Sequence, residues 1–149
     1  MNQATIHAYR REHDFLGETD IPAAAYWGVH SARVVENFPI SGQTVASMPA
    51  LVRARVRALV RALACVKKAA AQANLALGVL DAVRADAIVR ACDDLISGQL
   101  HDQFVVDVIQ GAAGTSTNMN ANEVIANRAL EHLGHPRRAT TRPCTRTTT

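Results

Sequence analysis

The chain has 149 residues, of which 48% are hydrophobic and only 4% aromatic, and its formal net charge is +3. This length allows one domain with its own core, and an apolar composition with so few aromatic side chains favours packed helices over a β-sandwich or barrel. The basic residues are not interleaved with aromatic ones, which argues against nucleic-acid binding, and no apolar stretch reaches the ~18 residues of a membrane span.

Signals for secretion and for metal binding are also missing from the sequence. The N-terminus is polar, unlike a signal peptide, so we expect a cytoplasmic protein. Cys65, Cys92 and Cys144 have neither metal-ligand nor redox spacing, and no metal site is expected. We predict that Cys65 and Cys92 are buried thiols in helices, as in a reducing compartment.

The N-terminal part is expected to be extended before the helices begin. Asp14–Gly17 followed by Ile21-Pro22 indicates a turn in an extended chain, because a proline excludes the residue before it from the helical region. Tyr26 and Trp27, which follow, and Phe38 further on are expected to anchor the core.

A long amphipathic pattern then predicts the first long helix, which ends at Gly78. Its apolar residues recur in steps of four and three and form a heptad seam: Val52, Val56, Leu59, Leu63, Val66, Ala70, Ala73 and Leu77. Such a seam requires a partner helix, from this chain or from a neighbouring subunit. Arg53, Arg57 and Arg61 lie on the other face, where we expect solvent.

A second helix is predicted from Asp81 to a stop at Gly98. The residues expected to point inward are Val83, Ile88, Ala91, Cys92 and Leu95. Asp93 and Asp94 are adjacent and therefore point about 100° apart on a helix, so we interpret them as surface residues rather than metal ligands.

The stretch from Gln110 to Gly134 organises the rest of the chain. Gly111–Thr117 carries no charge and leads into a helix whose C′ residue is Gly134. Free N–H groups at the start of that helix, together with the hydroxyl groups of residues 115–117 and the neighbouring asparagine amides, suit a carboxylate or phosphate. The alternative is that Thr115 or Ser116 simply caps the helix and the asparagines make local turn bonds.

Residues 114–129 read Gly-Thr-Ser-Thr-Asn-Met-Asn-Ala-Asn-Glu-Val-Ile-Ala-Asn-Arg-Ala. They resemble the first signature region of the fumarase/aspartase superfamily, on its aspartate ammonia-lyase side. The resemblance extends upstream through Asp102-Gln103-Phe104 to His13-Asp14-Phe15-Leu16-Gly17 and covers about residues 12–137. It implies a mainly α fold, with residues 1–137 as the N-terminal domain of the fumarase/aspartase (L-aspartase-like) fold, lacking the central helix-bundle domain.

The resemblance also implies an activity, the conversion of L-aspartate to fumarate and ammonia, with no metal or organic cofactor. Loss of the Cβ proton leaves a carbanion stabilised as an aci-carboxylate, which hydroxyl and N–H donors can stabilise. By resemblance, Thr115 is the expected donor to the substrate carboxylate, helped by Ser116 and supported by Asn118. His30 and Arg33 match a stretch close to the active site of the family, but an ordinary ion-pair role for Arg33 stays open.

Active sites of the family are assembled from three subunits of a homotetramer, by the same resemblance. This chain lacks the second contributing region, the loop whose serine is taken to be the general base, and the bundle that makes the tetramer. We therefore expect no catalytic residue in the chain and no turnover from it alone. Ala112 replaces a usual glycine, and Ala113 stands where fumarases usually have a serine.

Two other functions remain open. A class II fumarate hydratase would have the same fold and another leaving group, but Ala113, Tyr26–His30 and Asn37-Phe38 favour the ammonia-lyase branch. The other function is that of a non-catalytic helical fragment that associates through the Val52–Leu77 seam. The sequence favours this association over catalysis for the chain as it stands.

The family resemblance stops after Arg137. Six of the last ten residues are threonine, and residues 138–149 have no apolar periodicity. The codons of Ala139–Thr148, read one base earlier, can spell Gly-Asp-Tyr-Ala-Ala-Leu-His-Pro-Asn-Asp, which resembles the continuation of aspartases. We predict that residues 138–149 are an out-of-frame, unstructured tail that arises from a frameshift or a sequencing error.

Resequencing the gene from the codon for Leu133 onward, in all forward frames, tests this prediction. We expect the shifted frame to continue with His-Pro-Asn and, later, the serine loop. A gene that is in frame throughout this region would contradict the prediction.

Overall fold

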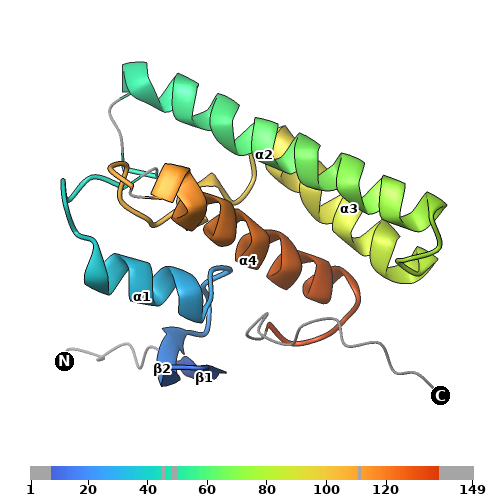
Figure 1. Cartoon of the computed structure of the whole chain (residues 1–149), viewed down its shortest axis with the longest axis horizontal. Coiled ribbons are helices and arrows are strands. Elements are labelled where there is room, and N and C mark those ends of the chain that lie inside the picture. The colour runs from blue at the N-terminus through green and yellow to red at the C-terminus, as the bar shows by residue number, and fades with distance from the viewer. Residues whose placement is uncertain (1–7, 45, 48–49, 111, 138–149) are drawn as a thin grey trace, which may run out of the picture.

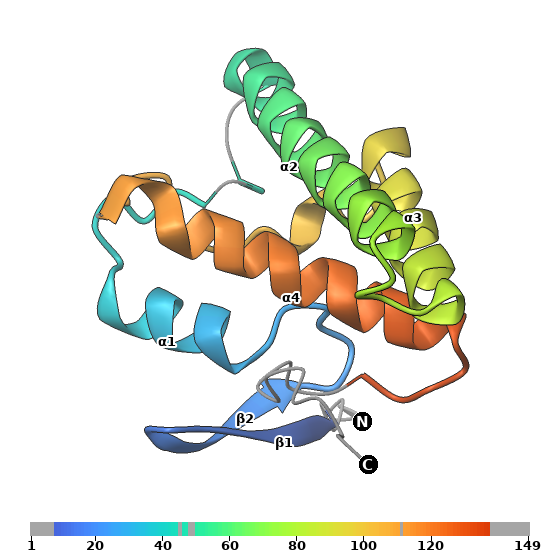
Figure 2. The same cartoon turned by 45° about the vertical axis from the view of Figure 1, so that its right-hand side comes forward.

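The computed structural model describes residues 8–44, 46–47, 50–110 and 112–137. The elements follow in the order β1, β2, α1, α2, α3 and α4, with two short 3-10 turns, His101–Gln103 and Ala112–Gly114, before α4. Helix α4 lies in the middle, with α1 and the two strands on one side and α2 and α3 on the other (Figures 1 and 2).

The two strands form an antiparallel hairpin. β1 (Tyr9–Asp14) pairs with β2 (Gly17–Pro22), so that Tyr9 lies opposite Pro22 and Asp14 opposite Gly17. Gly17 closes the turn with φ 116°, which costs glycine little and other residues much. The predicted turn in this segment is therefore confirmed, although the sequence analysis did not identify the hairpin around it.

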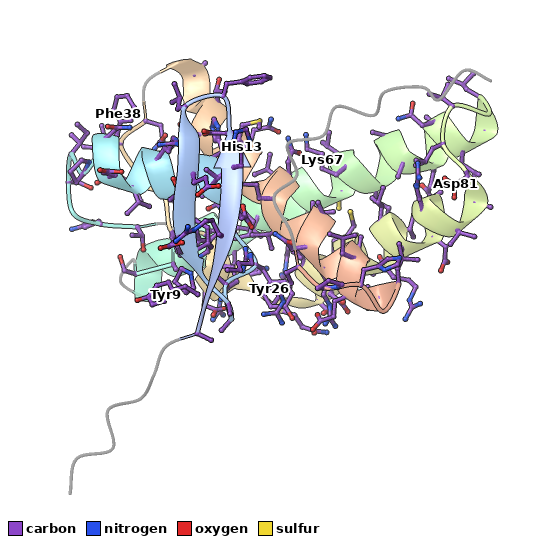
Figure 3. All side chains as sticks on the ribbon, turned by 90° about the horizontal axis from the view of Figure 1, so that it is seen from below. Tyr9, His13, Tyr26, Phe38, Lys67 and Asp81 are labelled. Atoms are coloured by element: carbon purple, nitrogen blue, oxygen red, sulfur yellow. The ribbon has the colours of Figure 1, made fainter. Side chains whose placement is uncertain are left out.

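Four α-helices follow, α1 (Val29–Asn37), α2 (Ala50–Ala76), α3 (Ala82–Ser97) and α4 (Thr115–His132). The caps predicted for α3 are confirmed, because Asp81 Oδ1 accepts the Arg84 N–H at 2.9 Å and Gly98 closes the helix with φ 103°. Figure 3 shows Asp81 at the tip where α2 and α3 join, at the other end of the molecule from Phe38.

The two ends of α4 differ in how well they were predicted. Gly134 has a left-handed conformation, and its N–H donates to the Glu131 carbonyl at 3.0 Å, as expected for a C′ glycine. At the start, the structure does not bear out the alternative in which Thr115 or Ser116 caps the helix. The N-cap is Gly114, with φ 80°, and it makes no side-chain cap bond.

The core lies between α2, α3 and α4, and Phe104 and Val106 close it. Most of its side chains are small, which lets the helix backbones approach closely. The buried helical members are Val34, Val60, Ala64, Ala87, Ala91, Cys92, Leu95, Ala121, Val124, Ile125 and Ala129. Burial raises the pKa of the Cys92 thiol to about 11, as befits an inert structural cysteine. Cys65 is exposed, so its predicted burial was wrong.

Helix α2 does not turn its predicted seam toward this core. Among its described side chains α2 buries Val60, Ala64 and Ala71, and Leu63 of the seam packs against the core, whereas Leu59, Val66 and Leu77 are exposed. Val83, expected to point inward, is also exposed. Tyr26 and Trp27 pack against the core as predicted, but Phe38 is 50% exposed, so its predicted role as a core anchor was wrong. The side chains of Val52 and Val56 are outside the described part of the chain, as is the predicted tail at 138–149. Among the described residues no helix has the length and apolar character of a membrane span.

Charged side chains join α3 to α4 at the surface. Asp94 accepts from Arg128 Nε at 2.7 Å and from His132 Nε2 at 2.8 Å, and these bonds lower the pKa of its carboxyl against the opposing effect of burial. Asp93 is exposed, as predicted, but Asp94 is a half-buried structural anion rather than a simple surface residue.

Glu131 ties the chain before α1 to the end of α4. Its carboxylate accepts from Tyr26 Oη at 2.6 Å, from Arg128 at 2.6 Å and from Arg137 at 3.1 Å, and the Arg137 guanidinium lies 3.9 Å from the centre of the Tyr26 ring. The bond from Tyr26, followed by those from the two arginines, lowers the pKa of Glu131 from 4.5 to about 2.

We predict that Glu131→Gln lowers the free energy of unfolding at pH 7 by on the order of 1 kcal/mol, because the 38% exposed side chain is partly screened by solvent. The folded-state pKa is depressed, so this stability is present above about pH 4.5 and is lost as the pH falls toward 2. Thermal melts at pH 7 and pH 3 measure the difference. Glu18→Gln in the exposed pair with Arg11 is the control, and an equal loss there would refute the prediction.

Candidate functional site

Two buried carboxylates hold the start of α1. Glu123 of α4 accepts the N–H groups of Gly28, His30 and Ser31 at 2.9, 2.9 and 3.1 Å and the Ser31 hydroxyl at 2.6 Å. Glu12 of β1 accepts the Val29 N–H at 2.9 Å. The first N–H groups of a helix have no hydrogen-bond acceptor within the helix, and the helix dipole favours an anion at that end. The two carboxylates therefore accept the hydrogen bonds that an N-cap side chain would otherwise accept.

Gly28, the N-cap residue of α1, has no side chain that could cap the helix. A Cβ at this position would lie 2.8 Å from Glu12 Oε2 and 3.0 Å from Glu123 Oε1, so glycine alone leaves room for both carboxylates. Glu12 also pairs with Arg10 at 2.7 Å, and Arg10 donates to the carbonyls of Ala25 and Trp27, each at 2.7 Å. The carboxylates are therefore fully bonded although they are only 3% and 4% exposed.

This anchoring places His30 beside a hollow of about 550 Å³. The hollow is lined by Met119 and Asn122 of α4, by Phe15 and Leu16 of the hairpin turn, and by Val29, Asp14 and Glu123 besides His30. Its wall is largely apolar, with a few polar groups converging on it, which is the usual character of a small-molecule site.

Arg33 is occupied by an ion pair. Its Nε lies 2.6 Å from Asp14 Oδ2, one terminal nitrogen lies 2.7 Å from Asp14 Oδ1, and the same nitrogen donates to the Gly17 carbonyl at 3.1 Å. This two-bond pair lowers the pKa of Asp14 and fastens the hairpin turn to α1. The arrangement favours the ion-pair alternative for Arg33, and of the two predicted residues of α1 it is His30 that lines the hollow.

Thr115, Ser116 and Asn118 all belong to the first turn of α4. Thr115 shares a face with Met119 and Asn122, four and seven residues later, so it is in line with the hollow and about 10 Å from Asn122 along the helix. Ser116 instead lies on the side of Glu123, and Asn118 on the side of Ile125. None of these three residues lines the hollow, although Thr115 and Ser116 lie on faces of α4 that reach it at Asn122 and Glu123, so the structure does not gather the predicted residues at one point.

The other asparagines of α4 have different roles. Asn120 is buried and bonds the backbone of Val105 and Gln103 at 3.1 and 3.2 Å, and Asn127 donates to the Tyr26 carbonyl at 2.8 Å. These bonds join distant segments and are not the local turn bonds of the alternative interpretation. Asn122, one of the asparagines expected to add amide donors to the pocket, lines the hollow.

The predicted site residues did not include Glu12, Glu123 or Asp107. Asp107 accepts from the N–H groups of Ser41, Gly42 and Ile109 at 2.8 to 3.0 Å and so fixes the loop before α4. One sequence signal existed, because Gly28 precedes α1 where a capping side chain would be expected. Within the described residues no group of three or more His, Cys, Asp or Glu could hold a metal ion.

Comparison with known proteins links this geometry to one family. A family model described as Lyase matches residues 17–147. The chain is 58% identical over 126 residues to a class II fumarate hydratase of Halobacterium salinarum, covering 85% of the chain and 25% of that protein. It is 53% identical over 130 residues to an aspartate ammonia-lyase of Pseudomonas aeruginosa, covering 87% and 26%. The chain therefore spans about a quarter of the length of the curated relatives it matches.

Two solved structures are similar to the fold. A fumarate lyase:delta crystallin from Brucella melitensis bound to cobalt matches with a TM-score of 0.80 and 59% identity, over 87% of this chain and 26% of that one. A class II fumarase from Schistosoma mansoni matches with a TM-score of 0.74 and 35% identity, over 85% and 25%. The predicted mainly α fold, as the N-terminal part of a fumarase/aspartase-like protein, is confirmed.

We predict that Glu123→Gln lowers the free energy of unfolding by about 2–4 kcal/mol, because the amide turns an N–H donor toward the N–H groups that the carboxylate now accepts. Chemical denaturation followed by circular dichroism measures the loss. Glu36→Gln removes the same charge from the exposed face of α1 and should change stability by less than about 0.5 kcal/mol. Equal losses in both variants would show that Glu123 does not anchor α1.

Proposed function

The chain belongs to the lyase family of the aspartate ammonia-lyases and class II fumarate hydratases, and we propose that it is the segment of an aspartate ammonia-lyase that binds a carboxylate of the substrate. The substrate would be L-aspartate and the products fumarate and ammonia. The parent enzyme would be a cytoplasmic homotetramer, with this segment contributing to active sites that neighbouring subunits complete.

The observation that carries the proposal is the face of α4 shared by Thr115 and Asn122. It begins at a helix N-terminus where Gly114 supplies no side-chain acceptor, and it leads to the hollow beside His30. Backbone N–H groups and the helix dipole at that end favour an anion, and a neighbouring hydroxyl adds a donor. The volume of about 550 Å³ leaves room for a four-carbon dicarboxylate.

Such a segment suits this reaction because negative charge builds up on a carboxylate of the substrate during the reaction. When the proton leaves Cβ, negative charge moves onto the adjacent carboxylate, and donors fixed at that point stabilise the transition state more than the ground state. Thr115 would make this contact, with Ser116 and Asn118 supporting the first turn. The general base would come from another part of the enzyme, so the 149-residue polypeptide alone is expected to release no ammonia.

A class II fumarate hydratase is the second candidate, and the 58% identity to the Halobacterium salinarum protein favours it. Both reactions pass through a carbanion beside a carboxylate, so the same donors at α4 would serve either one. Ala113 in place of a serine favours the ammonia-lyase, because a hydratase assembled on this segment would lack that hydroxyl group.

Two chimeras test the proposal and separate the candidates. Residues 1–137 are joined to the remainder of the Pseudomonas aeruginosa aspartate ammonia-lyase or to the remainder of the Halobacterium salinarum fumarate hydratase. We expect ammonia and fumarate from L-aspartate in the first chimera and little hydration of fumarate in the second. Activity of the second chimera alone would favour the hydratase.

Thr115→Val in the active chimera tests the carboxylate contact. We expect kcat/KM to fall by about 100-fold, as for the loss of one donor to a developing oxyanion. Thr19→Val removes a hydroxyl group from β2, away from the proposed contact, and should leave kcat/KM within a few-fold of the parent. An unchanged rate for Thr115→Val would remove this residue from the site.

A further inference from the structure

The first turn of α4 is not held in place by an N-cap side chain. Its N-cap residue is Gly114, with φ 80°, and the preceding Ala113 has φ 54° and ψ 33°. Both residues are left-handed, which is unfavourable for alanine, so the backbone keeps this shape only because the surrounding structure imposes it. The position of Thr115, the proposed donor to the substrate carboxylate, therefore depends on what fixes the chain just before α4.

Asp107 lies in the segment that leads into α4, and its side chain is tied to the loop after α1. Its Oδ2 accepts the N–H groups of Ser41 and Gly42 at 2.8 and 3.0 Å. Its Oδ1 accepts the Ser41 hydroxyl and the Ile109 N–H, each at 2.8 Å. The residue is only 6% exposed. Burial raises the pKa of the Asp107 carboxyl, but the four bonds together lower it below its usual value, so the side chain is ionised at neutral pH.

Backbone contacts complete the connection between the two segments. Thr44 pairs with Asp107 in an antiparallel bridge, and the Val108 N–H donates to the Gln43 carbonyl at 2.9 Å. The side-chain amide of Gln110 donates back to the Asp107 carbonyl at 2.6 Å. Figures 1 and 2 show the loop after α1 beside the start of α4. The chain that enters α4 is thus fastened to a neighbouring loop at Asp107.

The earlier part of the same segment is held in a different way. Asn120 of α4 bonds the Val105 N–H and the Gln103 carbonyl at 3.1 and 3.2 Å. These bonds keep residues 103–105 on α4 and do not involve Asp107. Loss of the Asp107 carboxylate would therefore release the last residues before α4 while the helix itself stays docked.

We propose that Asp107 is a positioning residue, which holds the first turn of α4 so that Thr115 meets the substrate carboxylate. The inference rests on the proposed function, because it concerns the same carboxylate contact. Donors to a developing charge must be fixed in place before the reaction, and a misplacement of about 1 Å can cost about 100-fold in rate. Asp107 acts through the backbone of residues 107–114 and does not touch the substrate.

NMR of the 149-residue chain tests the structural step without any need for turnover. We expect Asp107→Asn to shift the amide resonances of Thr115 and Ser116, because the new side-chain NH₂ group faces N–H groups that the carboxylate now accepts. Asp86→Asn removes the same charge from an exposed position of α3 and should leave these resonances in place. Shifts confined to residues 41–44 and 107–110 would overturn the proposal.

Ser41→Ala is a milder variant that keeps this test decisive if Asp107→Asn fails to fold. It removes one of the four hydrogen bonds to Asp107 and leaves the two backbone donors of the loop in place. The amide resonances of Thr115 and Ser116 should shift in the same direction as in Asp107→Asn and by less. Resonances that stay unchanged in a folded Ser41→Ala chain would contradict the link between this loop and α4.

A double-mutant cycle in the active chimera tests whether Asp107 acts through Thr115. We expect Asp107→Asn to lower kcat by about tenfold or more and to change KM less, because the contact strengthens in the transition state. In the Thr115→Val background the same change should cost less than about threefold, since the contact is already lost. An equal loss in both backgrounds would mark Asp107 as a purely structural residue and overturn the proposal.

The same cycle separates this inference from the proposed function. If Thr115→Val leaves kcat/KM unchanged, the carboxylate contact itself is absent, and both the proposed function of this segment and the role of Asp107 fail. If Thr115→Val lowers kcat/KM but Asp107→Asn does not, the carboxylate contact stands and only the positioning role of Asp107 is refuted.

Discussion

The structure depends on the burial of two glutamates against the first turn of α1. A carboxylate taken out of water is very costly unless hydrogen bonds replace those of the solvent. Here Glu123 receives four hydrogen bonds from residues 28–31, and Glu12 is shared between the Val29 N–H and Arg10. The hairpin, α1 and α4 meet at this point. Gly28 makes the meeting possible, since its missing side chain leaves the space that the two carboxylates fill.

The parts of the fold that could be predicted are those that depend on residues close together in the sequence. The limits of α3 follow from Asp81 and Gly98, and the end of α4 from Gly134, because caps involve residues within a turn of each other. The direction in which α2 faces could not be predicted. Its heptad pattern is real, but the helix buries Val60, Ala64 and Ala71 instead, and only the packing of other elements decides which stripe is covered. The same holds for Cys65, which a helical pattern placed inside and the fold places outside.

The candidate site was predictable only in part, and for a similar reason. Thr115 came from a resemblance in sequence, and the structure adds that it shares a face of α4 with Asn122, one of the residues that line the hollow beside His30. Arg33 bonds Asp14, which no spacing could reveal, because the two residues are brought together by the hairpin. Relatives with two different activities share this segment at 50% identity or more. That is understandable if the segment recognises the carboxylate common to both reactions.

The sequence distance between α1 and its anchor also constrains the order of events during synthesis. Gly28 and Glu123 are 95 residues apart, and an isolated helix of nine residues is barely stable in water. While a ribosome makes the chain, α2 and α3 can pair soon after they emerge, but the N–H groups of Gly28, His30 and Ser31 have no Glu123 to accept them until α4 has left the exit tunnel. Glu12 is available earlier, but only for the Val29 N–H, so α1 is expected to become ordered together with α4.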